Sequence, residues 1–342
     1  MELEELAKRC QICAQNNPAI VLGSGASVPH GIQGMNQLAN WLRENIVTET
    51  EAEVSNWQSI KDELTNGTAL EAVLDKFGPL PNSLIDKIVL STWNFVSKDD
   101  YALFMRAVLG TESFPLSNLL RGLFQSTNKE INVITTNYDR AIEYAVDISG
   151  LIHKCGFLPG YIKRLYGSRD LSFQLANQKA KTVTIWKVHG SIDWFADPMG
   201  NVVSLPFSDV LPEKFVPQIV TPGVSKYERT HDEPFRTTIQ GADRVLETAT
   251  AIICVGYGFR DRHIHPKLTD RCRTNNIPIL IAARTLMDEA REFLRNSGGD
   301  KYIALEDHDE GTNVFTSRYS NGVVVSGGKF WKLPELNKAI GF

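Results

Sequence analysis

The stretch Ala19-Ile20-Val21-Leu22-Gly23-Ser24-Gly25-Ala26-Ser27 is the strongest indication of the fold class in the chain. Its first four residues form a short apolar run of the kind expected for a buried strand, and a glycine loop follows at once. Apolar residues then recur at helical spacing at Leu38, Trp41, Leu42 and Ile46. A buried strand that leads through a glycine loop toward a helix is the opening unit of an α/β sheet.

Later segments repeat this alternation of strands and helices. The apolar runs predict strands at 131–135, 183–188, 251–255 and 277–282. Helical spacing between and after them predicts helices at 140–146, 234–249, 263–275 and 286–296. The expected fold is therefore α/β, with a Rossmann-like parallel sheet that carries helices on both faces.

Two insertions and a tail interrupt the alternation. We expect residues 1–300 to form the main domain, with a helical insertion at about 48–126 and a loop subdomain at about 147–232. Residues 193–232 are rich in proline and glycine, which predicts a long loop or small subdomain. Residues 301–342 are expected to form a C-terminal hairpin around Asn321-Gly322 and an extension.

Composition and charge exclude several classes of protein. The 342 residues are 42% hydrophobic and 22% charged, which is typical of a globular chain. The net charge of −4 gives no basic footprint, so direct nucleic-acid binding is not expected. The chain shows no signal peptide and no run of 18 apolar residues, so we expect a cytoplasmic protein that does not span a membrane.

The cysteines predict neither a disulfide framework nor a metal site. They number five, and Cys10 and Cys13 form the single CxxC pair. A zinc ribbon needs a second pair, so no zinc ribbon and no bound metal are expected. Cys10 and Cys13 share one helical face with Leu3 and Leu6, which favours core packing over metal or redox use.

The glycine loop is a candidate phosphate site because it stands at the carboxyl end of a predicted strand. Ligands bind at that edge of an open α/β sheet, and glycines there let backbone N–H groups approach an anion. Val28 stands where the dinucleotide fingerprint has its third glycine, so the loop is not that of a standard dehydrogenase. A simple tight turn is the alternative.

Three more polar segments follow strand ends. Asn137 and Asp139 come directly after the strand at 131–135; they can hold ribose hydroxyls or a water, or form an Asx-turn that starts the next helix. His189 ends another strand and is either a general base or a structural histidine. Asp261, in the Gly256-Tyr257-Gly258 loop region, can accept bonds from a ribose diol or cap the following helix.

In this order, the four segments resemble the sirtuin family and its sirtuin-like bacterial branch. The resemblance implies a fold that binds NAD as a substrate, with Asn137, His189 and Asp139 as catalytic residues and His189 as the base. By the same resemblance, the NAD-binding residues are Gly23, Ser24, Gly25, Ala26, Ser27, Thr136, Tyr138, Gly256, Gly258 and Asp261.

Two departures set the chain apart from zinc-containing deacylases. It lacks their two CxxC pairs, and Gly31-Ile32-Gln33-Gly34-Met35-Asn36 stands where they have Gly-Ile-Pro-Asp-Phe-Arg. The pattern is closer to sirtuin-like NADases of bacterial anti-phage defence. This resemblance implies an NAD+ glycohydrolase that acts by NAD depletion, as a homo-oligomer or with a HerA-type DNA-translocating ATPase. The alternatives are a deacylase or ADP-ribosyltransferase, and a non-catalytic NAD or ADP-ribose sensor.

Overall fold

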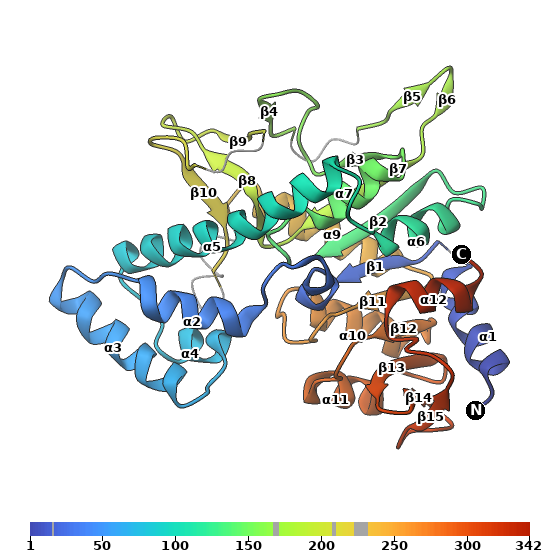
Figure 1. Ribbon diagram of the computed structural model, residues 1–342. Helices are drawn as coiled ribbons and strands as arrows, with labels where there is room; N and C mark the ends of the chain where they lie inside the picture. The colour runs from blue at the N-terminus through green and yellow to red at the C-terminus, as the bar shows by residue number, and fades with distance from the viewer. Residues whose placement is uncertain (16, 167–170, 207–209, 222–231) are drawn as a thin grey trace.

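The computed structural model describes residues 1–15, 17–166, 171–206, 210–221 and 232–342 (Figure 1). Its centre is a nine-stranded sheet with the order β15-β14-β13-β12-β11-β1-β2-β7-β3. From β13 to β3 neighbouring strands are parallel, whereas β14 and β15 are antiparallel. The strands are β1 (Ala19–Leu22), β2 (Glu130–Thr135), β3 (Ile152–Lys154), β7 (Thr182–Lys187), β11 (Ile252–Val255), β12 (Ile279–Ala282), β13 (Tyr302–His308), β14 (Gly311–Thr316) and β15 (Val323–Ser326).

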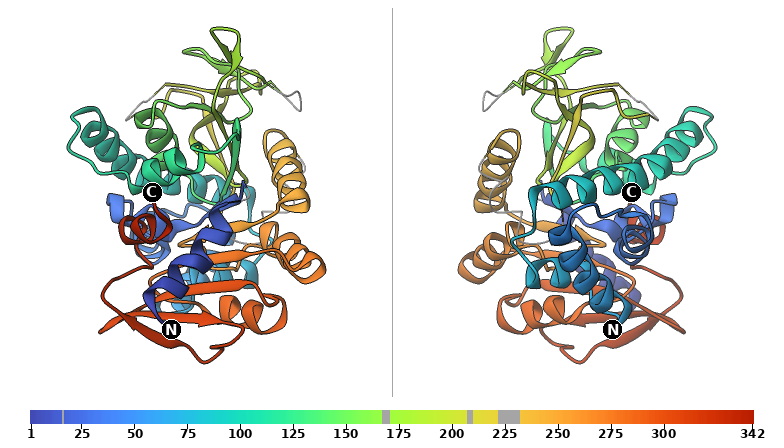
Figure 2. Two further views of the ribbon diagram at one scale, coloured as in Figure 1. Left: turned by 90° about the vertical axis from the view of Figure 1, so that its right-hand side faces the viewer. Right: turned by 90° about the vertical axis from the view of Figure 1, so that its left-hand side faces the viewer.

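Helices cover both faces of this sheet, because successive strand residues point to opposite sides. Ile20 and Leu22 enter one core with α1 (Leu3–Ala14), α6 (Pro115–Leu123), α7 (Ala141–Ile148) and α12 (Leu333–Ile340). Ala19 and Val21 enter the opposite core with α9 (Phe235–Thr248), α10 (Ile264–Asn275) and α11 (Asp288–Asn296). Figure 2 shows the sheet between these helix layers. The predicted α/β fold class is confirmed.

A third core belongs to a smaller module of helices and strands. Its helices are α2 (Met35–Asn45), α3 (Glu51–Thr65), α4 (Leu70–Lys76) and α5 (Asn82–Val108). They pack against a four-stranded sheet of order β10-β8-β9-β4, made of β10 (Val216–Ile219), β8 (Gly190–Ala196), β9 (Val202–Ser204) and β4 (Lys163–Arg164). A separate hairpin joins β5 (Gln174–Leu175) to β6 (Gln178–Lys179).

Several boundaries differ from the sequence prediction. Within the helical insertion, residues 82–108 form the single long helix α5, whose buried Asp100 is paired with Arg140. The region 147–232 contains β3 to β10 rather than loops alone, although 167–170, 207–209 and 222–231 lie outside the described residues. The boundary expected at residue 300 falls inside the main sheet, since β13 pairs with β12.

The cysteine prediction favours packing, and the structure agrees. Cys10 and Cys13 are fully buried in the core, and burial raises the pKa of both thiols, that of Cys13 to about 12. Within the described ranges no three His, Cys, Asp or Glu side chains gather as a metal site would require. None of the helices described in the chain combines the length and apolar character needed to cross a bilayer.

Candidate functional site

The carboxyl ends of the parallel strands open into a cleft of about 480 Å³. The cleft lies at the end of β1, whose neighbours in the sheet are β2 on one side and β11 on the other. The strand order reverses at β1, and such a topological switch point is the usual ligand site of an open α/β sheet. All four predicted segments meet there. The predicted residues that line it are Gly23, Ser24, Gly25, Ser27, Thr136, Asn137, Tyr138, Asp139, His189, Gly256, Gly258 and Asp261.

The two glycine loops pack directly against each other. The Gly25 amide donates to the Gly256 carbonyl oxygen at 3.1 Å. A Cβ added at Gly23 would lie 2.4 Å from that oxygen, and Gly256 has a φ of +58°. Glycine is required at these positions because backbone fills the space that a side chain would occupy. Gly258 differs, since a Cβ there would meet nothing within 4 Å.

This packing changes the interpretation of the 23–27 loop as a phosphate cradle. Two 3-10 turns, η1 (Ser24–Ala26) and η2 (Val28–His30), follow β1, and α2, the first α-helix after this strand, begins only at Met35. The amides of Ala26 and Ser27 donate to the carbonyl oxygens of Gly23 and Ser24 within the turn. Ala26 is not among the cleft residues and instead packs partly buried against the core. The tight-turn alternative therefore accounts for much of this loop.

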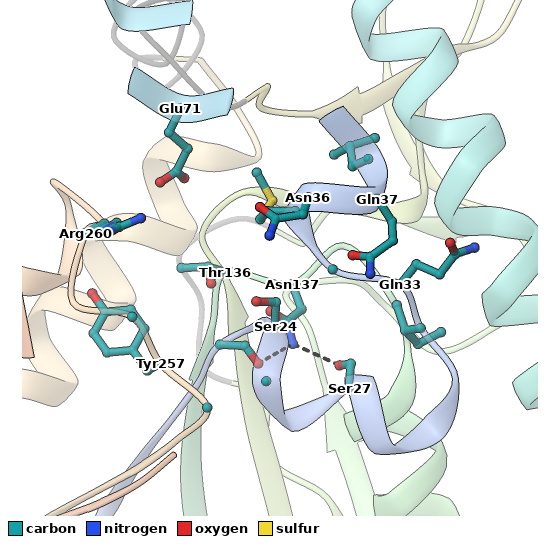
Figure 3. A pocket seen from close by; sticks show the side chains of 18 of the residues that line it. Ser24, Ser27, Gln33, Asn36, Gln37, Glu71, Thr136, Asn137, Tyr257 and Arg260 are labelled. Carbon is teal, nitrogen blue, oxygen red and sulfur yellow. Dashed lines mark hydrogen bonds between the residues drawn. The ribbon is translucent and has the colours of Figure 1, made fainter. Parts of the chain in front are cut away.

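Asn137 is held at the floor of the cleft by two hydrogen bonds (Figure 3). Its Nδ2 atom donates to the Gly23 carbonyl oxygen and to Ser27 Oγ, each at 2.9 Å. A carbonyl oxygen only accepts, so the amide nitrogen must be the atom that faces Gly23. The orientation of the amide leaves Oδ1 as the acceptor that a ligand or water could use.

Asp139 stands behind Asn137 and serves the local structure. Its Oδ1 atom accepts from Ser27 Oγ at 3.0 Å and from the Ala141 amide at 3.1 Å, at the start of α7. This is the Asx-turn alternative considered from the sequence. Burial raises the pKa of Asp139, against the opposing charge of Lys187. The Lys187 ammonium is fully buried and contacts the Asp139 carbonyl oxygen and Glu143.

His189 lies at the junction of the two sheets. Strand β7 ends at Lys187, and β8 begins at Gly190, whose φ of +81° turns the chain sharply between the sheets. A Cβ at Gly190 would lie 2.0 Å from the Gln218 carbonyl oxygen, so the turn requires glycine. The imidazole is buried, and its Nε2 atom lies 2.7 Å from Asp261 Oδ2.

Asp261 therefore contacts His189 and also caps a helix. Its Oδ1 atom accepts from the amides of His263 and Ile264, both at 2.9 Å, where α10 begins. The N-cap alternative from the sequence describes this oxygen. The second carboxylate oxygen, Oδ2, faces the His189 imidazole, and the spacing of the two residues in the sequence gave no sign of this contact.

Tyr138 lines the cleft but directs its hydroxyl elsewhere. The hydroxyl donates to the Val220 carbonyl oxygen at 2.6 Å, and burial raises the pKa of the phenol. Its ring centroid lies 6.4 Å from that of His189. Tyr138 thus ties the loop after β2 to the chain just after β10 and packs beside the candidate base.

The sequence analysis missed one whole side of the cleft, which the helical module supplies. The polar side chains on this side that Figure 3 labels are Gln33, Asn36, Gln37 and Glu71. Ile32, Met35, Leu38, Leu70, Phe95 and Val96 add an apolar surface. None of these residues follows a strand, so the strand-end rule could not find them. Arg284, after β12, does follow one and was overlooked, as was Arg260, which pairs with Glu289 at 2.8 Å.

Comparison with known proteins bears on the family. Residues 131–298 match the model of the SIR2-like domain, a span slightly shorter than half of the chain. The match includes β2, β7, β11, β12 and the loops that carry Asn137, His189 and Asp261. It supports a sirtuin-like family for this protein. No curated protein matches the chain.

Solved structures of Sir2 proteins can be aligned over most of the chain. One, described as the structural basis for the mechanism and regulation of Sir2 enzymes, is 15% identical, with a TM-score of 0.47, and the alignment covers 99% of this chain and 97% of that one. A Sir2 homologue mutant with 2′-O-acetyl ADP-ribose is 13% identical, with a TM-score of 0.49 and coverage of 98% and 96%. A Sir2 homologue–NAD complex is 14% identical, with a TM-score of 0.43 and coverage of 88% and 87%.

Proposed function

We propose that this protein binds NAD+ in the cleft and hydrolyses the bond between nicotinamide and ribose. The observation that carries the proposal is the meeting of Asn137 and His189, from the ends of β2 and β7, in one cleft beside the glycine loops. The sirtuin-like domain match supports NAD+ as the ligand. Exposed Ser24 and the open space at Gly258 leave room for the diphosphate.

The chemistry breaks the bond between the anomeric carbon and the nicotinamide nitrogen, and nicotinamide leaves with the bonding electrons as a neutral molecule. Positive charge then develops on the ribose, and water adds to the anomeric carbon. Asn137 Oδ1 orients the water or a ribose hydroxyl, while His189 accepts the proton that the water loses. The products are nicotinamide, ADP-ribose and one proton. General-base assistance of this kind typically contributes about 10²–10⁴-fold.

The test is NAD+ turnover by the purified protein, with nicotinamide and ADP-ribose separated by chromatography. We expect His189→Ala to reduce kcat by about 10²–10⁴-fold, because the proton acceptor is lost. Asn137→Ala should also reduce kcat, because the reacting groups lose their positioning. Matched controls are His308→Ala and Asn56→Ala, whose side chains lie outside the cleft. Full turnover by both folded site variants would refute the assignment.

The same assay separates the rival functions. Nicotinamide release that requires an acyl-lysine peptide or a protein acceptor would indicate a deacylase or an ADP-ribosyltransferase. Binding of NAD+ or ADP-ribose without turnover, alone and with added partners, would indicate a sensor. Anti-phage defence, a homo-oligomer and a HerA-type ATPase partner stay predictions of the sequence resemblance, and measurement of turnover with and without such an ATPase tests the last of them.

A further inference from the structure

We propose that Asp261 is a positioning residue that fixes the tautomer of His189, so that Nδ1 is the ring nitrogen that takes the proton during turnover. The sequence interpretation leaves two roles open for Asp261, acceptor of a ribose diol and helix cap, and neither of them involves the imidazole. The proposal instead makes Asp261 act through the imidazole. Its consequence for turnover rests on the proposed function, whereas the pairing of the two side chains does not.

The first observation is the contact itself. His189 Nε2 lies 2.7 Å from Asp261 Oδ2, and the two side chains are only 6% and 5% exposed. His189 lies in the turn after β7 and Asp261 in the loop after β11, and β1 and β2 separate these two strands in the sheet. A close contact between an imidazole and a carboxylate in a buried setting determines which nitrogen carries the hydrogen, because a carboxylate accepts and an Nε2–H donates.

The second observation is that the carboxylate is held from behind. The amides of His263 and Ile264 both donate to Oδ1, so Oδ2 is the oxygen turned toward the ring. The loop before it is also anchored. Phe259 is fully buried, has a φ of +61°, and packs against Phe293 with ring centroids 5.0 Å apart. The carboxylate therefore has one orientation to offer.

The third observation is that the imidazole is held at its backbone. The His189 carbonyl oxygen accepts from the Val220 amide at 2.9 Å, and Gly190 fixes the turn that follows. The centroid of its ring lies 6.4 Å from that of Tyr138 and 6.5 Å from that of His263. In the arrangement we propose, Nε2 carries the hydrogen and is turned toward Asp261, which leaves the lone pair on Nδ1 as the proton acceptor.

The arrangement predicts an unusual effect of Asp261→Asn. The two helix amides need an oxygen acceptor, so the asparagine oxygen takes the place of Oδ1. The side-chain nitrogen then faces His189 Nε2 and presents a donor to it. The ring responds by keeping its hydrogen on Nδ1, where it blocks proton acceptance. The variant keeps the helix cap, and with it the fold, but reverses the tautomer.

The experiment combines nitrogen-15 NMR of the histidine rings with steady-state kinetics on the full-length protein. The His189 signals are assigned by their loss in His189→Ala. We expect an Nε2–H ring in the wild type and an Nδ1–H ring in Asp261→Asn. The kcat for NAD+ should fall by about 10²–10⁴-fold in Asp261→Asn, with KM nearly unchanged. Asp261→Ser, which also caps helices, serves as the second variant.

The matched control is Asp270→Asn, the same change at an exposed site on α10. It should keep both the Nε2–H tautomer and the wild-type kcat. An Nε2–H ring and an unchanged kcat in Asp261→Asn would overturn the proposal, and so would a raised KM with unchanged kcat, because Asp261 would then bind the nucleotide itself. If the wild type does not cleave NAD+, the proposed function fails, and the NMR arm still decides the pairing.

Discussion

The two walls of the cleft are built in different ways. The strand-end wall, formed by residues 23–27, 136–139, 189 and 256–261, is fixed by backbone contacts and buried hydrogen bonds. The helical wall, formed by residues 32–38, 69–71 and 95–96, is fixed mainly by side-chain packing in a separate core, although Ile32 packs in the core of the main sheet. The strand-end wall has the groups suited to chemistry. The helical wall adds polar and apolar side chains to the lining of the same cleft.

The largest expected effect concerns the packing of the helical wall. Trp93, on α5, is 2% exposed and donates from Nε1 to the Ile192 carbonyl oxygen at 2.7 Å. Trp93→Ala removes this contact with β8 and leaves a large cavity, so the free energy of unfolding should fall by about 3–5 kcal/mol. Urea denaturation measures it. Trp331→Ala, at a half-buried ring, is the control and should cost less. If Trp93→Ala lowers the free energy of unfolding by less than about 1 kcal/mol, the packing of α5 against β8 does not depend on this ring.

A pair of glycine substitutions probes the strand-end wall. Gly256→Ala places a Cβ 2.3 Å from the Gly25 carbonyl carbon at a φ of +58°, so it should destabilise the protein by about 1–3 kcal/mol. Gly258→Ala meets nothing within 4 Å and should leave stability within about 0.5 kcal/mol of the wild type. Thermal or urea unfolding compares them. Equal effects on stability would show that the contact between the glycine loops is not what requires glycine.

The next effect depends on pH and belongs to the helical module. Hydrogen bonds from Ser83, from the Glu49 amide and from Lys87 lower the pKa of Glu53 from 4.5 to about 2. Because the folded-state pKa is below the unfolded one, the stabilisation is complete above pH 4.5 and is lost as the pH falls toward 2. The urea concentration at the midpoint of unfolding, measured from pH 6 to pH 3, should therefore fall less in Glu53→Gln than in the wild type. If the midpoints of both proteins fall equally with pH, Glu53 is not the group that causes the loss of stability.

The smallest effect is expected where the module meets the strand-end wall. Asp75 on α4 lies 2.9 Å from Arg262, but the two side chains are 26% and 62% exposed. Solvent and salt weaken such a pair, so Asp75→Asn should change the free energy of unfolding by less than about 0.5 kcal/mol. Unfolding at low and high salt checks this. A larger loss that disappears at high salt would show that the ion pair holds the walls together.

The strand-end wall was largely predictable from the sequence, and the helical wall was not. Buried parallel strands are continuous apolar runs, so β1, β2, β7, β11 and β12 and the loops after them could be located. The short strands of the smaller sheet were missed because their exposure is mixed and their sequence is partly polar. The partners of Asp100 in the middle of α5 could not be predicted either, because they lie some 40 residues further along the chain: Arg140 just before α7 and Tyr144 within it both donate to Asp100 Oδ2.

The α/β class, the strands of the main sheet and the meeting of four polar loops at one edge could be predicted from the sequence, because apolar runs and glycines act locally. The roles of the individual residues in these loops depend on contacts that form only in the folded chain. Asp139 forms an Asx-turn just before α7, Gly23 and Gly256 pack on each other, and Asp261 reaches His189. These partners are distant in the chain, and only the folded sheet brings their atoms within hydrogen-bonding or contact distance.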